Sequence, residues 1–232
     1  MSAPGKIAIA SYNIRKAIGR DGRRNPRRIL DVIANLSADV VVLQEADFRF
    51  GGRRPIFDAD ELQSITGLRA VDVAPDVEGL GWHGNVLLLR PDAAIQSVKA
   101  VPLQGSDPRG AVVSDLDLHG RSLQLIHGHL GLLPHQRARQ ATLLAAEISH
   151  TPTVILGDFN AAGPRPPSLR GLSSVLNEVV HGATFPTRWP CLRFDRMFHC
   201  DGLAVSDPMV VDTPLTRVAS DHLPIKATFH WT

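Results

Sequence analysis

The stretch VILGDFNA, residues 154–161, joins a short apolar run to two polar side chains, Asp158 and Asn160. The apolar residues at its start are typical of a strand that is buried inside a sheet. Successive side chains of a strand alternate between its faces, so Asp158 and Asn160 can point to the same spot. The same residue types are also common where a strand simply ends in a turn. This stretch alone favours the turn, and the rest of the sequence decides between the two interpretations.

The sequence on either side of this stretch predicts a mixture of strands and helices. Strands are expected at residues 6–13, 38–45, 84–90, 95–103, 110–118, 122–130, 152–160, 193–199, 203–211 and 224–231, with a hairpin turn at 119–121. Helices are expected at 26–36, 58–66 and 133–149, with a short one after the Pro-rich loop 161–168. Because some strands are joined by helices and others by a hairpin, we predict an α/β fold in which mixed sheets pack face to face, with helices outside.

Composition predicts a single globular domain, 1–232. Of its 232 residues, 44% are hydrophobic and 21% charged, and no apolar run is long enough for stable membrane insertion. The N-terminus lacks the pattern of a secretory signal, so a cytoplasmic location is expected. Cys191 and Cys200 are too few for a disulfide framework or a zinc site and are expected to be reduced, packed thiols. A monomer is the default expectation.

The basic residues of the chain are unevenly divided between arginine and lysine. The net charge is only +2, but 21 of the 25 basic residues are arginine. The planar guanidinium suits bidentate recognition of phosphate. Two arginine-rich clusters stand out, at residues 20–28 and 49–55. Each cluster is either a solvated basic face or a surface that contacts phosphate, and the sequence leaves both interpretations open.

Polar residues recur at the ends of the predicted strands. They are Asn13, Glu45, His129, Asp158 with Asn160, Asp195, and Asp221 with His222, the last pair at the opening of the final strand. Each residue alone could be a cap, a turn former or a packed histidine. Their recurrence favours a site, because binding groups gather at the exposed ends of packed sheets.

Seven motifs, in this order, resemble the endonuclease/exonuclease/phosphatase superfamily: SYNIR, VVLQEAD, HGNVLLLR, HGHLGLLPHQRARQ, VILGDFNA, TFPTRWPCLRFDRMF and SDHLPI. These enzymes are metal-dependent phosphoesterases that include pancreatic deoxyribonuclease and exonuclease III-type enzymes. The resemblance covers nearly the whole chain and is strongest to short bacterial members. It implies a four-layer α/β sandwich and hydrolysis of a phosphodiester by in-line attack of water. The implied cofactor is Mg²⁺, for which Mn²⁺ can substitute.

The resemblance also implies roles for individual residues. Glu45 would be the direct metal ligand, with Asn13 beside it and Asp221 as a further or water-mediated ligand. Asp158 would orient and deprotonate the attacking water, and Asn160 would hold the phosphate or the nucleophile. His222 would contact the scissile phosphate, with its tautomer fixed by Asp195. His129 would act on the leaving-group side.

Three further residues are predicted to bind substrate phosphate or to lie against the substrate. Arg15 matches the deoxyribonuclease-like form of the first motif, where exonuclease III-type members usually carry an acid. This difference argues against an abasic-site endonuclease. Arg188 and Trp189 lie in the loop that flanks the site in the family, where Trp189 either stacks on substrate or anchors the loop.

Three functions are compatible with this sequence. The first is a Mg²⁺-dependent nuclease with nucleic acid as its partner, with DNA favoured over RNA. The second is a phosphodiesterase or phosphatase for a lipid headgroup or a small phosphate ester, since one fold can carry both activities. The third is a non-catalytic binding module, which is disfavoured because every expected polar position is filled.

Overall fold

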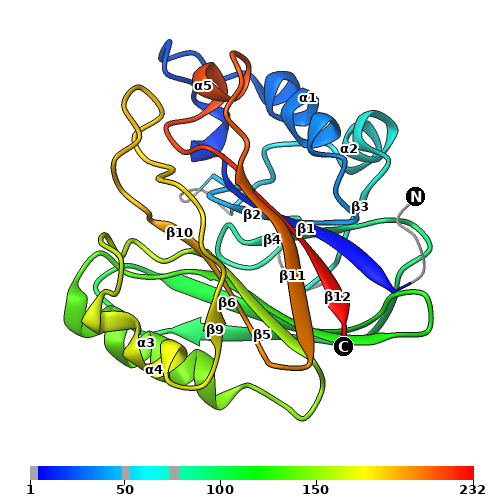
Figure 1. Ribbon diagram of the computed structural model, residues 1–232. Coiled ribbons are helices and arrows are strands. Elements are labelled where there is room, and N and C mark those ends of the chain that lie inside the picture. The colour runs from blue at the N-terminus through cyan, green and yellow to red at the C-terminus, as the bar shows by residue number, and fades with distance from the viewer. Residues whose placement is uncertain (1–4, 49–52, 74–78) are drawn as a thin grey trace.

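The computed structural model describes residues 5–48, 53–73 and 79–232, which form two six-stranded sheets (Figure 1). The first sheet has the strand order β11-β12-β1-β2-β4-β3. Its strands are β1 (Lys6–Asn13), β2 (Val40–Gln44), β3 (Arg69–Ala70), β4 (Val86–Leu89), β11 (Leu203–Val210) and β12 (Ile225–Trp231). Only β1 and β2 pair in parallel among these described strands, so the sheet is mixed.

The second sheet has the strand order β5-β6-β7-β8-β10-β9. Its strands are β5 (Ala94–Leu103), β6 (Arg109–Asp117), β7 (Ser122–His129), β8 (Thr153–Asp158), β9 (Asn177–Glu178) and β10 (Asp195–His199). β7 and β8 pair in parallel, and the other pairs are antiparallel. β6 and β7 form the hairpin that the sequence predicts.

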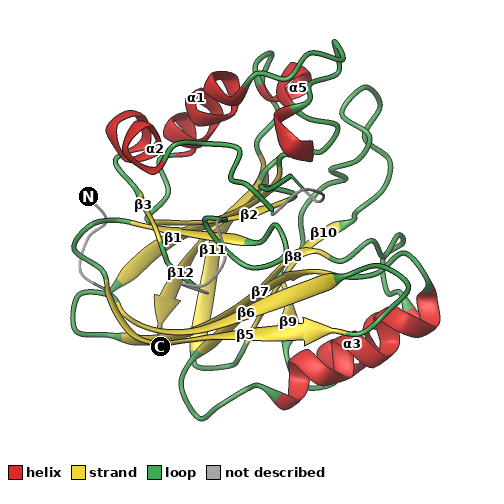
Figure 2. Ribbon diagram, turned by 180° about the vertical axis from the view of Figure 1, so that it is seen from behind, coloured by secondary structure: helices red, strands yellow, loops and turns green. Residues whose placement is uncertain are grey.

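Helices cover the outer faces of both sheets (Figure 2). α1 (Pro26–Leu36), α2 (Ala59–Thr66) and the short α5 (Thr216–Ala219) lie on the first sheet. α3 (Pro134–Ala146) lies on the second sheet, with α4 (Arg170–Ser173) beside it (Figure 1). α1 starts where the Asn25 side chain accepts a hydrogen bond from the backbone N–H of Arg28, with Pro26 in the first turn. The predicted four-layer α/β sandwich is confirmed.

The core between the sheets is apolar at one end and polar at the other. Its apolar part contains Ile7 and Ile9 of β1, Val40 and Val42 of β2, and Leu156 of β8, all at most 3% exposed. Side chains alternate along a strand, so the next inward positions of β1 and β2 belong to the polar residues 11, 13 and 44. The change occurs toward the carboxyl ends of the parallel strands, where loops leave the sheets.

Several details differ from the sequence-based expectations. β3 and β9 were not predicted, because two residues carry no periodic pattern. The last strand begins at Ile225, so Asp221 and His222 lie in the preceding loop. Cys191 is exposed and is therefore not packed, although both cysteines are free as expected. Among the described residues, no helix is long and apolar enough to cross a membrane.

Candidate active site

Strand register brings three of the predicted site residues side by side. His129 of β7 pairs with Asp158 of β8, and Asp158 pairs with Asp195 of β10. All three are less than 5% exposed. Asn13, at the end of β1 in the opposite sheet, reaches across and donates from Nδ2 to Asp158 Oδ2 at 2.8 Å. The two sheets therefore meet at one carboxylate.

Asp158 Oδ2 is the point on which the site converges. Besides Asn13, it lies 3.2 Å from His129 Nε2 and 3.8 Å from His222 Nε2. Its other oxygen, Oδ1, accepts a hydrogen bond from the backbone N–H of Asn160 at 3.0 Å. Burial raises the pKa of Asp158, but the charges of His129 and His222 and the hydrogen bonds from His129 and Asn13 lower it more, to well below its usual range. The carboxylate is therefore ionised.

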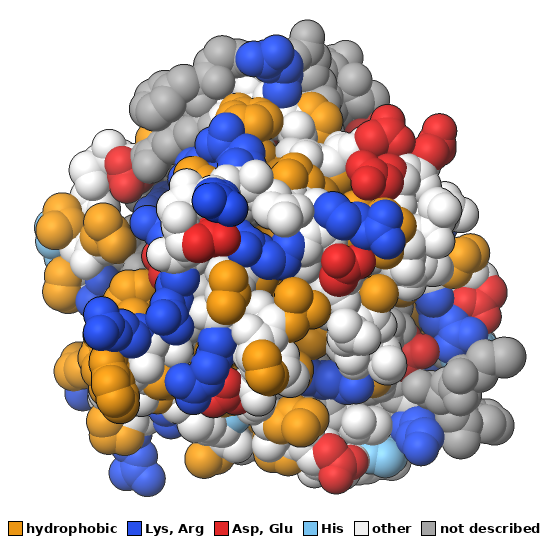
Figure 3. Space-filling model, turned by 90° about the horizontal axis from the view of Figure 1, so that it is seen from above, with side chains coloured by type: hydrophobic (Ala, Val, Ile, Leu, Met, Phe, Trp, Pro, Cys, Tyr) orange, Lys and Arg blue, Asp and Glu red, His pale blue; other side chains and the backbone are white. Residues whose placement is uncertain are grey.

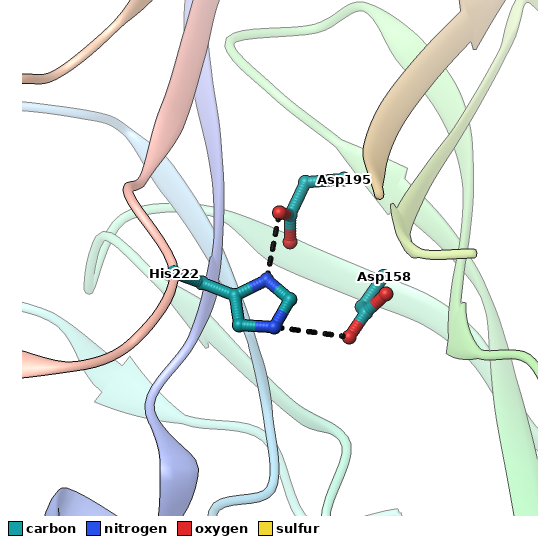
Figure 4. A group of neighbouring side chains, drawn as sticks. All are labelled: Asp158, Asp195 and His222. Atoms are coloured by element: carbon teal, nitrogen blue, oxygen red, sulfur yellow. Dashed lines mark hydrogen bonds and ion pairs between the residues drawn. The ribbon is translucent and has the colours of Figure 1, made fainter. Parts of the chain in front are cut away.

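His222 lies between two carboxylates (Figure 4). Its Nδ1 is 2.9 Å from Asp195 Oδ2, which also accepts a hydrogen bond from Thr184 Oγ1 at 2.5 Å. The rings of Phe185 and Phe194 pack beside the imidazole, with centroids 4.9 Å and 6.3 Å from its own. These contacts fix the position of the ring and leave Nε2 directed toward Asp158.

The electrostatic surroundings of His222 keep it protonated. Burial lowers the pKa of His222, but the charges of Asp195 and Asp158 and the hydrogen bond to Asp195 raise it to about 10 overall. The imidazole is therefore a cation at neutral pH. A buried cation can stabilise the negative charge that develops on a phosphoryl oxygen.

Asn160 and His129 form a second pair at the end of β7 and β8. Asn160 adopts a left-handed conformation, with φ of 50°. Its Nδ2 donates to the carbonyl of Leu130 at 3.0 Å and lies 3.1 Å from His129 Nε2. The opening stretch therefore ends in a turn at which Asn160 bends the chain and contacts the neighbouring histidine.

Comparison with known proteins agrees with this geometry. A model of the Endonuclease/Exonuclease/phosphatase family matches residues 10–222, which is most of the chain. The chain belongs to this family. It is therefore a hydrolase of phosphoric esters, within a superfamily of divalent-metal-dependent phosphoesterases.

One similar sequence and two similar folds match nearly the whole chain. The uncharacterized protein YbhP of Escherichia coli (strain K12) is 26% identical over 249 residues, covering 96% of this chain and 95% of YbhP. The Bacteroides thetaiotaomicron mannosyl-6-phosphatase Bt3783 has a similar fold, with a TM-score of 0.77, 19% identity and coverage of 97% and 100%. D. rerio TDP2, solved in complex with a single-strand DNA product, gives a TM-score of 0.72, 17% identity and coverage of 97% and 99%.

The predicted metal ligands lie around the same site, but two of them contact cations. Glu45 Oε2 is 2.6 Å from Lys16 Nζ, and Asp221 Oδ2 is 3.3 Å from Arg15 Nε. Burial raises the pKa of Glu45, but the charge of His129 and the hydrogen bond from Lys16 bring it below the ordinary value. Glu45 is thus an ionised, partly buried carboxylate, which suits a hard divalent ion.

A second group of donor atoms could also hold a metal ion. Asp158, Asp195 and His222 each offer one atom, and these atoms lie within 4.8 Å of one another. The hydrogen bond between His222 Nδ1 and Asp195 already uses two of the three side chains, and His222 is protonated. A protonated imidazole has no lone pair for a metal. The carboxylate of Glu45 therefore fits a family metal better than this group does.

The loop that carries Arg188 and Trp189 is fixed to the site through its backbone. Thr187 N–H donates to the carbonyl of Asp221, and its hydroxyl donates to the carbonyl of Ser220, both at 3.0 Å. Trp189 is 74% exposed, so it does not anchor the loop by packing. Arg188 is also exposed, and no hydrogen bond or ion pair in the described part of the chain joins it to the side chains around Asp158.

The arginine clusters are only partly available to an anionic partner. In the cluster at 20–28, Arg27 pairs with Asp31 and Arg28 pairs with Asp21. Arg24 lies over the ring of Phe48, 4.6 Å from its centroid, and donates to the carbonyl of Lys16. Basic side chains are spread over the face seen in Figure 3, with acidic ones among them. Arg49, in the cluster at 49–55, lies outside the described residues, as do 50–52.

The structure adds two residues that the sequence did not single out. Lys16 contacts Glu45, and the Nη1 atom of Arg109 lies 2.7 Å from Nδ1 and 2.8 Å from Nε2 of His129. Arg109 is the first residue of β6, and Lys16 directly follows the first motif. The sequence signal for both is a basic residue at or near the end of a predicted strand.

Proposed function

We propose that this protein is a Mg²⁺-dependent phosphodiesterase that cleaves DNA, with Mn²⁺ as a substitute ion. The observation that carries this proposal is the buried carboxylate of Asp158, whose Oδ2 lies within 3.8 Å of Asn13, His129 and His222. A carboxylate between two histidines, at the mouth of two packed sheets, can position water on one side of a phosphate.

Asp158 contributes mainly by orienting the attacking water. Its pKa is well below the ordinary value for the reasons given above, so it accepts a proton less readily than a carboxylate with a pKa near neutrality. It remains ionised throughout the physiological range and always offers a hydrogen-bond acceptor. Asn13 and Asn160 hold its two oxygens, which fixes the direction from which water approaches the phosphorus.

His222 and His129 act on the phosphoryl group. His222 is protonated and held by Asp195, so its Nε2–H can donate to a phosphoryl oxygen as charge accumulates there. His129 lies against Arg109 and beside Asn160, and we assign it to the leaving oxygen. A divalent ion bound by Glu45, with Asn13 and Asp221 nearby, would supply further positive charge to the phosphoryl oxygens.

The surroundings of the site favour a nucleic acid. Trp189 is a large, exposed aromatic side chain on a loop fixed to Asp221, and bases stack on such side chains. Arg15, which contacts Asp221, and Arg24, which contacts the Lys16 carbonyl, add positive charge near the site. A nucleic acid fits both the exposed tryptophan and the nearby arginines, because its bases can stack and its phosphates carry negative charge. The TDP2 structure with a DNA product shows that this fold can hold a DNA strand in another protein.

A small phosphate ester is the second candidate substrate, and a specific observation favours it. A small cavity beside Glu45 is lined by polar and charged side chains, including Lys16, Asp47, Arg53, Arg109 and His129. Its basic side chains Lys16, Arg53 and Arg109 can pair with a compact anion, and Trp189 does not line the cavity. The mannosyl-6-phosphatase of similar fold shows that the fold can serve a phosphomonoesterase.

A substrate panel tests the proposal. Plasmid DNA, single-stranded DNA, RNA, an abasic duplex, sphingomyelin and sugar or inositol phosphates would be incubated with Mg²⁺ or Mn²⁺. We expect cleavage of DNA that stops in excess chelator. Turnover of only a small phosphate ester would establish the second candidate.

Glu45→Gln tests the metal assignment within the same assay. The amide keeps the size of the side chain but loses the charge that attracts a divalent ion, so we expect a sharp loss of activity with partial recovery at high Mn²⁺. Full activity of the wild-type protein in excess chelator would contradict the metal assignment.

A further inference from the structure

The segment Arg15–Ala17, which follows the first strand, has an unusual backbone. Its three residues all lie in the left-handed region, with φ of 48°, 54° and 58°, although none is glycine. This conformation is unfavourable for residues with a Cβ atom and occurs mainly as single residues. Three in succession need a surrounding structure that holds them, and such strain points to a function.

Backbone hydrogen bonds hold this segment against the residue that follows β2. Ile14 N–H donates to the carbonyl of Gln44, and Lys16 N–H donates to the carbonyl of Glu45, both at 3.0 Å. Glu45 also has a positive φ, of 54°. The parallel pairing of β1 and β2 therefore continues past the ends of both strands, into residues with positive φ. Lys16 and Glu45 face each other because their backbones are bonded.

The turn directs two successive cations at two carboxylates. Lys16 Nζ contacts Glu45 Oε2 at 2.6 Å, and Arg15 Nε contacts Asp221 Oδ2 at 3.3 Å. The Lys16 and Glu45 side chains are only 30% and 26% exposed, so solvent screens their attraction less than at an open surface. These carboxylates are the two that the family resemblance assigns to the metal.

We propose that Lys16 and the divalent ion compete for Glu45, and that Lys16 displaced from Glu45 binds the phosphate of the substrate. This inference rests on the proposed function. Lysine suits the task because its ammonium group is a compact charge on a long, flexible chain. Lys16 and Glu45 line the same small cavity, so a phosphate bound beside Glu45 would offer the ammonium group a new anionic partner within its reach.

The exchange couples the binding of the ion to the binding of the substrate. Without substrate, the ammonium group of Lys16 forms an ion pair with the Glu45 carboxylate. The positive charge of Lys16 then weakens the attraction of Glu45 for a divalent ion. With a phosphate present, Lys16 has another partner and the ion meets a free carboxylate. Coupling is reciprocal, so the ion must strengthen substrate binding by the same factor.

Mn²⁺ binding by Lys16→Met tests the exchange without recourse to activity. The affinity would be measured by calorimetry and by the EPR signal of free Mn²⁺, with and without an uncleavable phosphorothioate oligonucleotide. We expect Lys16→Met to bind Mn²⁺ roughly tenfold more tightly than the wild type in the absence of oligonucleotide, because a cation next to the ligand has been removed. The oligonucleotide should then strengthen Mn²⁺ binding less in the variant than in the wild type.

Two controls keep the result interpretable. Lys99→Met removes a lysine from another Lys–Glu pair, in which Nζ lies 2.8 Å from Glu147 on the outer part of the second sheet, and should leave Mn²⁺ affinity unchanged. Lys16→Asn removes the charge with a residue that tolerates a positive φ, so it should reproduce Lys16→Met if folding of the turn is not the cause.

Failure of this inference differs from failure of the proposed function. If the wild type cleaves DNA with Mn²⁺ but both Lys16 variants bind Mn²⁺ no more tightly than Lys99→Met, the exchange is wrong and Lys16 only neutralises Glu45. If the wild type binds no Mn²⁺ and cleaves nothing, the metal-dependent function fails, and the exchange fails with it.

Discussion

Asp158 combines an ionised carboxylate with burial between two histidines, and its contribution can be separated from that of its neighbours. Asp158→Asn keeps the shape and the hydrogen-bonding reach but removes the charge that orients the attacking water. We expect kcat to fall on the order of 10²–10⁴-fold with KM nearly unchanged, since the interaction matters mainly in the transition state. Steady-state kinetics together with Mn²⁺ affinity would measure this split.

Asp195→Asn is the matched control for that substitution. Asp195 acts through His222, whose pKa it raises more than any other neighbouring charge does. Its removal should lower the pH at which the alkaline limb of the activity profile begins, because His222 then loses its proton earlier. Asp158→Asn turning over near the wild-type rate would make Asp158 a turn residue and no more.

At the scale of single elements, β7 carries a histidine that the site does not use. His127 is fully buried and, among the described residues, neither ring nitrogen has a hydrogen-bond partner. Burial lowers the pKa of His127 from 6.5 to about 3. Between these values the unfolded chain binds a proton that the folded chain does not, so the free energy of unfolding falls as the pH falls, by up to about 1.4 kcal/mol per pH unit.

His127→Leu should flatten that dependence. Urea unfolding of the wild type and the variant between pH 7 and pH 4 would measure the difference in slope. His150→Gln, at an exposed position, controls for the loss of a histidine. If the free energy of unfolding changes equally with pH in the wild type and in His127→Leu, then His127 takes up its proton in the folded protein as readily as in the unfolded chain.

The approach of β7 to β8 depends on glycine at one position. Gly157 has φ of 146°, and a Cβ built there would lie 2.0 Å from the carbonyl oxygen of Gly128. Gly157→Ala should therefore lower the free energy of unfolding by about 3 kcal/mol or more, since both strands must shift. Gly163→Ala is the control, because φ is 87° but nothing lies within 4 Å, so only the backbone cost of about 1 kcal/mol applies. If chemical denaturation shows that both variants lose the same free energy of unfolding, the close approach of Gly157 to Gly128 is not what requires glycine.

Across the whole molecule, sequence predicted the layers and most of the polar residues that the structure brings together around Asp158, for identifiable reasons. Strands and helices longer than four residues carry periodic patterns, and polar residues such as Asp158 and Asn13 interrupt those patterns at strand ends. The position of Lys16 against Glu45 could not be predicted, because it depends on three left-handed residues that have no glycine to signal them. Arg109 meets His129 through strand register, which short-range patterns do not reveal.

The salt dependence of DNA binding is a property of the whole charged surface. Each phosphate neutralised by a basic side chain releases counterions, so the logarithm of the binding constant falls with the logarithm of the salt concentration. Within the cluster at 20–28, Arg23 is exposed, whereas Arg27 already pairs with Asp31 at 3.0 Å. Arg23→Gln should therefore reduce the salt slope by about 1, and Arg27→Gln by less, if the cluster tracks the phosphate backbone.

Fluorescence anisotropy with a labelled oligonucleotide, titrated at several salt concentrations, would measure these slopes. Lys99→Gln, on β5, serves as a remote control because it removes one positive charge from an ion pair elsewhere in the molecule. A slope that stays the same in Arg23→Gln would make the cluster a solvated face. If the slope stays the same and a small phosphate ester is hydrolysed, the cluster does not track a phosphate backbone and the small-ester function is favoured over DNA cleavage.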